Sequence, residues 1–167
     1  GYFPSLAIGE KETEPQMDGF EKRQPVPVTL GISYDFWALS HLAKELGKDD
    51  EYEKFSPRAN DYKNLWHPEH RLFMPKDESG NWVDIDPKSA GGLGYREYYD
   101  ENNGWTYAWD VQHDIEGLTG LLDGKKAAED RLDQLFREPL GMKKKYFHVN
   151  GSNSTGMVGQ FSMGNEP

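Results

Sequence analysis

The chain has 167 residues, no cysteine, and 29 acidic against 19 basic residues, which gives a formal net charge of −10. No stretch approaches the ~18 consecutive apolar residues of a membrane span, so none is predicted. The acidic charge disfavours binding to a nucleic-acid backbone. The lack of cysteine excludes disulfides, thiol catalysis and cysteine-based zinc sites.

The mean hydropathy is low, at −0.89, yet the chain is rich in aromatic residues. Hydrophobic residues make up 35% of the chain and aromatic residues 13%. A disordered chain would not carry five Trp, nine Tyr and eight Phe. We therefore expect a folded chain in which much of the core is aromatic.

The N-terminal part combines an irregular segment with a long helix. Residues 1–27 contain four prolines and show no helical or strand period. A helix is predicted over 28–46, and Gly47 follows it where a left-handed residue often closes a helix. The residues expected on its buried face are Phe36, Leu39, Leu42, Ala43 and Leu46.

A second helix is predicted to start at Asp49 or Asp50, either of which can cap it, and to continue to Trp66. Pro57 lacks the backbone N–H that the helical ladder needs, so we expect a kink or a restart there. A β-hairpin is then predicted from 72–75 and 82–85 around a glycine-containing turn.

Two more helices complete the expected secondary structure. The third is predicted over 104–122 and the fourth over 125–137, where Pro139 follows. The residues expected to be buried by the fourth helix are Ala128, Leu132, Leu135 and Phe136.

The predicted fold class is mainly α, with a small β-hairpin and long loops. Four helices in two hairpin-like pairs suit part of an α/α toroid better than a four-helix bundle. Four helices cannot close such a ring, and the chain begins without an initiator Met or a signal peptide. We therefore expect a piece of a longer polypeptide that packs on parts outside this chain.

Residues 95–114 are the densest candidate for chemistry. Aromatic rings alternate there with carboxylates and asparagines, a composition that suits a carbohydrate, because sugar C–H faces stack on rings and hydroxyls bind polar side chains. The alternative is an aromatic core face with solvated acids. His113 and Asp114 could be an orienting pair, His113 a metal ligand, or both a satisfied structural pair.

The C-terminal residues Asn165 and Glu166 place an amide oxygen and a carboxylate side by side. These are oxygen ligands of the kind that calcium takes, although an ordinary turn has the same composition.

Several segments together resemble glycoside hydrolase family 92, the calcium-dependent exo-acting α-mannosidases. YKNLWHP at 62–68 resembles the family's YKNLFDP, and ENNGWTYAWDVQHD at 101–114 resembles EGNxWQYTWFVPHD. GQFSMGNEP at 159–167 resembles GQYAHGNEP, and 29–43 is similar to the family's TLEYAYDDWCIAQMA helix.

The resemblance implies a bilobal enzyme with an N-terminal β-sandwich and a C-terminal (α/α)6 barrel. Residues 1–167 would be a single segment of helical hairpins from that barrel, and the sandwich and the rest of the barrel would lie outside this chain. It also implies a secreted, periplasmic or cell-surface protein that acts on mannose-containing glycans.

The resemblance further implies an inverting mechanism, in which an acid and a base lie ~6.5–9.5 Å apart on opposite sides of the sugar. Glu101 matches the general acid. The catalytic base belongs to a downstream segment that this chain lacks, so the chain alone should be inactive. Asn165 and Glu166 would support the calcium. The residues expected to bind substrate or shape its pocket are Trp105, Trp109, His113, Asp114, Asp35 and Gln160.

The match is not complete. Thr106, Asp110 and Gln112 stand where the family motif has Gln, Phe and Pro, and Ser162-Met163 replaces Ala-His. These differences leave linkage specificity open. Two alternatives also stay open: a non-catalytic mannose- or carbohydrate-binding relative, and a purely structural helical domain.

Overall fold

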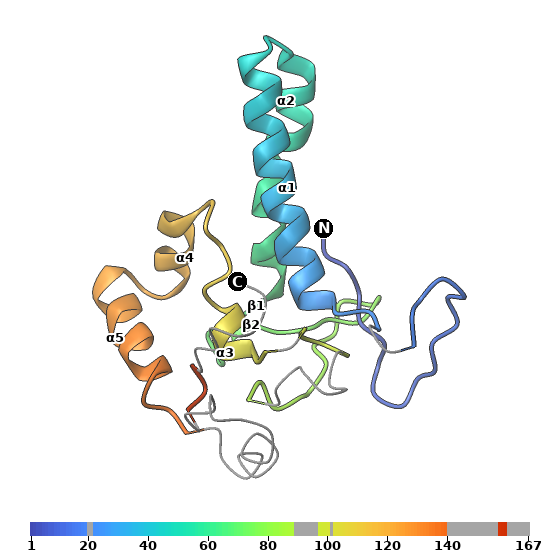
Figure 1. The fold of residues 1–167 in the computed structure, drawn as a ribbon, viewed down its shortest axis with the longest axis vertical. Helices are drawn as coiled ribbons and strands as arrows, with labels where there is room; N and C mark the ends of the chain where they lie inside the picture. The colour runs from blue at the N-terminus through green and yellow to red at the C-terminus, as the bar shows by residue number, and fades with distance from the viewer. Residues whose placement is uncertain (20–21, 89–96, 101, 140–156, 160–167) are drawn as a thin grey trace, which may run out of the picture.

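The computed structural model describes residues 1–19, 22–88, 97–100, 102–139 and 157–159. Within them the protein is mainly helical with one small antiparallel sheet. The helices of residues 25–65 form an arm that projects from the rest of the structure (Figure 1). The later, shorter helices lie beside the base of this arm (Figure 1). No helix in the described ranges is both long enough and apolar enough to cross a membrane.

Helix α1, Pro25–Glu45, begins slightly earlier than predicted because Pro25 occupies its first turn. Proline is favoured there, since the missing N–H would have no helical partner. The C-terminus is as predicted: Gly47 has a φ of +65°, and the N–H of Lys48 donates to the carbonyl of Ala43 at 2.9 Å. A left-handed glycine therefore closes the helix.

The predicted buried face of α1 is wrong for its leucines. Leu39, Leu42 and Leu46 are 44%, 55% and 62% exposed. The face that packs on the next segments is lined by Val26, Leu30, Ser33, Ser40 and Ala43. The serine hydroxyls donate to carbonyls within the helix, so this face is buried without leaving those hydroxyls unpaired, and its small side chains permit close packing.

The second predicted helix divides at the proline. Helix α2, Asp49–Phe55, gives way to the 3-10 helix η1, Ser56–Leu65, and Pro57 occupies the first turn of η1. The capping prediction is wrong, because Lys48 is the N-cap and the two aspartates lie in the first turn of α2. There they still favour the helix through its dipole.

The sheet differs from the predicted hairpin. Strand β1, Trp66–His67, pairs with β2, Leu72–Phe73. The predicted partner segment forms only an isolated antiparallel bridge between Lys76 and Trp82, around a turn in which Gly80 has a φ of +86°. The turn chemistry was thus read correctly, but Leu72 and Phe73 hydrogen-bond to β1 instead.

The predicted helix over 104–122 is broken. Helix α3, Gly104–Tyr107, and helix α4, Ile115–Leu121, are separate, because Asn103 and Asp114 each cap a new helix with their own side chain. Helix α5, Lys125–Leu135, ends close to its predicted limit and buries Ala128 and Leu135. Burial was predicted wrongly for Leu132 and Phe136, which are 42% and 55% exposed.

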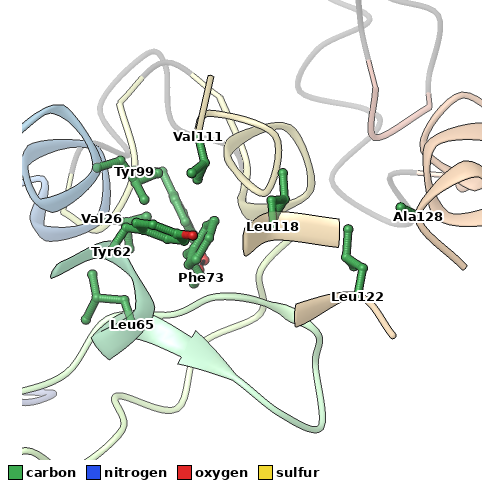
Figure 2. Packing of buried hydrophobic residues seen from close by; sticks show 10 residues of the cluster. Val26, Tyr62, Leu65, Phe73, Tyr99, Val111, Leu118, Leu122 and Ala128 are labelled. Carbon is green, nitrogen blue, oxygen red and sulfur yellow. Dashed lines mark hydrogen bonds between the residues drawn. The ribbon is translucent and has the colours of Figure 1, made fainter. Parts of the chain in front are cut away.

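The main core joins the arm to the later helices. Val26, Tyr62, Phe73, Tyr99 and Leu118 are all almost fully buried in it, and Figure 2 shows Tyr62 and Phe73 together at its centre. The rings of Tyr62 and Phe73 meet edge to face with centroids 5.8 Å apart. The hydroxyl of Tyr99 donates to the carbonyl of Phe73 at 2.8 Å. Aromatic rings thus stand at the centre of the core, but most of the buried apolar residues in the described ranges are aliphatic, so the aromatic share is smaller than expected.

A smaller cluster lies beside the main core. It consists of Leu72, Trp105, Ala108, Leu135 and Val158, with Trp109 packed against both clusters. This smaller cluster brings α3, α5 and the segment at Val158 together, although they are far apart in the sequence.

The buried ring of Phe73 supplies the first prediction. Replacing Phe73 by Ala should lower the free energy of unfolding by about 3–5 kcal/mol, because it removes a fully buried ring between Tyr62 and Trp66. Phe136→Ala, at a half-exposed position, is the matched control and should change it by less than about 0.5 kcal/mol. Chemical denaturation measures both, and equal losses would contradict the assigned core.

Candidate functional site

A hollow of about 400 Å³ lies between α1 and the connection from α3 to α4. Asp35 contributes an exposed carboxylate from α1, and Asp110 and Gln112 contribute polar groups from the connection. The amide of Gln112 donates to Asp110 at 2.6 Å. Tyr34, which is 44% exposed, supplies an aromatic surface to the same hollow. Two segments that are distant in sequence thus combine a ring with hydrogen-bonding groups, as a sugar site requires.

The two candidate tryptophans occupy different environments. Trp105 is only 8% exposed, and the guanidinium carbon of Arg131 lies 3.6 Å from the centre of its ring. This cation covers the ring and stabilises it from α5. Trp109 is half-buried and touches both apolar clusters. Trp105 therefore packs α3 against α5, and Trp109 packs the connection after α3 against the two apolar clusters.

His113 joins the connection to the arm. Its Nε2 lies 2.9 Å from the carbonyl oxygen of Ala59, and because a carbonyl only accepts, Nε2 is the donor. The ring meets Tyr34 and Tyr62 edge to face, at centroid distances of 5.9 and 5.6 Å. The Nδ1 atom is buried and has no hydrogen-bond partner among the described residues.

Asp114 connects three elements through one carboxylate. It accepts from the backbone N–H of Gly117 at 2.8 Å, which caps α4, and from the hydroxyl of Tyr62 at 2.7 Å. The ammonium of Lys63 lies 3.3 Å away. Partial burial raises the pKa of Asp114, but the hydrogen bonds from Tyr62, Gly117 and Lys63 outweigh it, so the pKa lies below its ordinary value.

Burial also raises the pKa of Tyr62, and the bond to Asp114 raises it further. The phenol therefore stays protonated and remains the donor in this pair.

Four of the candidate site residues lie outside the described residues: Glu101, Gln160, Asn165 and Glu166. The described residues close to them in the sequence include Asn103 and Val158, both fully buried. Among the residues that the structure describes, no group of three or more histidine or carboxylate side chains is arranged to hold a metal. The structure therefore brings Asp35 to the connection that contains His113 and Asp114. Trp105 and Trp109 pack together in the smaller apolar cluster.

The functional reading of the sequence missed three residues that the structure makes prominent. Asp110 and Gln112 line the hollow although they were noted only as departures from a motif. Asn103 is buried and caps α3. An Asn directly before a Gly-Trp-Thr helix start is a capping signal that could have been found in the sequence.

The whole chain, residues 1–167, matches the glycosyl hydrolase family 92 catalytic domain. The chain belongs to glycosyl hydrolase family 92. The resemblance inferred from the sequence segments is thereby confirmed, and the protein is of a glycoside hydrolase family.

Solved structures of family 92 enzymes from Bacteroides thetaiotaomicron are similar to this chain. An inverting mannosidase of strain VPI-5482 shares 32% identity and a TM-score of 0.61, over 77% of this chain and 16% of its own. An α-mannosidase in complex with mannoimidazole shares 30% identity and a TM-score of 0.62, over 69% of this chain and 16% of its own.

Among curated proteins, an uncharacterized secreted glycosidase of Arthroderma benhamiae is 28% identical over 127 residues, which is 64% of this chain and 16% of that protein. The chain thus spans about one sixth of the length of each of these three proteins.

The Asp114 carboxylate of this family 92 chain supplies a prediction about stability. Asp114→Ala should lower the free energy of unfolding at pH 7 by about 1–2 kcal/mol, because α4 loses its cap and Tyr62 its acceptor. The folded-state pKa lies below 3.8, so the carboxylate stabilises the fold above that pH and the stabilisation is lost as the pH falls through the folded-state pKa.

Denaturation of wild type and variant from pH 7 to pH 2 checks both parts of this prediction. The difference between the two proteins should shrink at the acid end. A constant difference over the whole range would show that the charge of Asp114 contributes nothing.

Proposed function

We propose that this chain forms part of the active site of a secreted or cell-surface enzyme. This enzyme would remove terminal α-linked mannose from glycans and invert the configuration at the anomeric carbon. The carrying observation is the hollow in which Asp35 of α1 meets Asp110 and Gln112 after α3. Both segments belong to the family 92 motifs, and the similar solved structures include an inverting mannosidase and one in complex with mannoimidazole. The secreted relative supports an extracellular location.

In this proposal Glu101 is the general acid that protonates the departing oxygen. Inversion also needs a base that activates water on the opposite face of the sugar. That base would come from a part of the polypeptide outside this chain, as would the rest of the (α/α)6 barrel. The chain alone would therefore bind part of the sugar but would not hydrolyse it.

Asp35 and the Asp110–Gln112 pair would accept and donate hydrogen bonds to sugar hydroxyls, with the ring of Tyr34 against an apolar sugar face. Trp109, His113 and Asp114 would hold the connection that carries Asp110 and Gln112. Trp105, whose ring contacts the guanidinium of Arg131, would hold the start of α3. Glu101 lies shortly before this helix in the sequence. Asp110 and Gln112 stand where the family motif has Phe and Pro. This hollow would therefore favour a substrate that places a polar group against these two side chains.

Calcium fits the donor chemistry proposed for the C-terminal segment. Asn165 and Glu166 offer hard oxygen donors of the kind that calcium takes. When bound, calcium would hold two adjacent sugar hydroxyls and favour a distorted ring. Gln160, on the same segment, would hydrogen-bond to the sugar.

A non-catalytic mannose-binding relative is the second candidate, because several positions of the motif around α3, among them Thr106, Asp110 and Gln112, are changed. The two candidates differ in one observable, the release of mannose.

The acid assignment predicts that Glu101→Gln in the full-length enzyme leaves sugar binding within about twofold but lowers turnover by about 10²–10⁴-fold, the usual contribution of general acid catalysis. The loss should be largest for a mannobiose and small for an aryl α-mannoside whose leaving group needs no proton. Mannose release followed by NMR measures both rates and also gives the anomer. Equal turnover of variant and wild type would contradict the role of Glu101, and no release by wild type would favour the binding protein.

Metal removal supplies a further prediction. Chelation of the full-length enzyme should weaken mannoside binding by at least about tenfold, which is about 1.4 kcal/mol, and added calcium should restore it. Asn165→Ala in excess calcium should reproduce part of the loss. Calorimetric titration with a mannoside measures the affinity, and an unchanged affinity after chelation would count against the calcium assignment.

A further inference from the structure

Asn103 is a fully buried amide whose two ends serve different segments. It is 1% exposed. Its Oδ1 accepts from the backbone N–H groups of Trp105 and Thr106, at 2.9 and 3.2 Å. Its Nδ2 donates to the carbonyl oxygen of Val158 at 2.8 Å. The opposite orientation of the amide would set its NH₂ group against two N–H donors, so these bonds determine its orientation.

The segment that receives this bond is itself firmly held. Val158 is fully buried, and its N–H donates to the carbonyl of Glu138 at 2.8 Å. The N–H of Gly159 donates to the carbonyl of Leu135 at 2.9 Å. A Cβ at Gly159 would lie 2.5 Å from the Leu135 side chain, so only glycine fits this approach. The carbonyl of Val158 is therefore presented to Asn103 from a packed backbone.

Both ends of this contact lead directly to residues of the proposed site. Glu101 precedes Asn103 by two residues, and Gln160 follows Val158 by two residues. The backbone that the Asn103–Val158 hydrogen bond holds is therefore continuous, within two residues, with both of these proposed site residues. The bond thus joins the segment that carries the proposed acid to the segment that carries Gln160, Asn165 and Glu166.

A helix cap alone does not account for this arrangement. Capping α3 uses only the acceptor Oδ1, and Ser or Asp would cap about as well. The donor Nδ2 serves Val158 and contributes nothing to the helix. Asn103 accepts hydrogen bonds from α3 at one end and donates one to Val158 at the other. We take this pairing to mean that the buried amide connects these two segments.

We propose that Asn103 is a positioning residue that sets the location of Glu101 relative to the Gln160–Glu166 segment, an inference that rests on the proposed function. Asn103 does not touch the substrate. It acts by joining the N-terminus of α3, which follows Glu101 in the sequence, to the backbone at Val158. Displacement of a reacting group by ~1 Å can cost 10²-fold in rate, so this constraint matters for turnover more than for binding.

The test compares Asn103→Ser and Asn103→Asp in the full-length enzyme. Both variants keep a side-chain acceptor for α3 and remove the Nδ2 donor to Val158. The Thr106 hydroxyl, 3.4 Å from the same carbonyl oxygen, stays in place in both. Thr29→Val is the matched control: Thr29 is 2% exposed and its hydroxyl joins Pro25 to the backbone N–H of Phe3, away from the Asn103–Val158 contact. The thermal midpoint of each variant is measured first, so that loss of stability is known separately from loss of rate.

The readout is turnover of a mannobiose against turnover of dinitrophenyl α-mannoside, whose leaving group needs no protonation. For the Asn103 variants we expect a loss of about tenfold or more on the mannobiose, a change of less than about threefold on the aryl mannoside, and KM within about threefold. Thr29→Val should show no difference between the two substrates. Should Asn103→Ser fail to fold, Asn103→Asp, which keeps more of the original shape, carries the test.

Equal losses on both substrates, in either folded Asn103 variant, would show that Asn103 only stabilises the fold and would overturn the proposal. Glu101→Gln measured beside them separates the two levels of inference. If Glu101→Gln shows the leaving-group dependence and the Asn103 variants do not, only the positioning role is wrong. If Glu101→Gln shows none, the proposed function and the positioning role fall together.

Discussion

The hydrogen bond from Tyr62 to Asp114 is the contact on which the arrangement of the two helical parts depends. Tyr62 lies in η1, fully buried against Phe73, and Asp114 begins α4. A buried phenol needs a partner, and a helix N-terminus favours a carboxylate, so one bond satisfies both requirements. It also sets the end of the connection from α3 to α4, and with it the hollow that faces α1.

Buried polar side chains perform the same task elsewhere, as a chain with so few aliphatic residues requires. Asn103 joins α3 to Val158, Thr29 joins α1 to the N-terminal segment, and Tyr99 binds the backbone of β2. Each bond is directional, so it specifies register as well as adding stability. The hollow beside α1 is lined by segments held in this way.

Local signals in the sequence predicted the secondary structure well where one residue dictates the backbone. Gly47 closed α1 with a positive φ, Pro57 ended α2, and Gly80 formed the predicted turn. Predictions of burial, which depend on tertiary contacts between helices, were less successful. Leu39 and Phe136 were expected inside and lie half-exposed, because apolar spacing identifies a stripe on a helix but not the neighbour that covers it.

The sequence by itself determined the family, because the family's motifs can be recognised in order along the chain without knowledge of the fold. It also determined the helix ends at Gly47 and Pro57, where local sterics decide. Only the tertiary structure brought Asp35 beside Asp110 and showed that one amide, on Asn103, serves two segments. The physical reason is that such contacts join residues far apart in the chain. Their formation depends on the packing of whole helices, which no local pattern encodes.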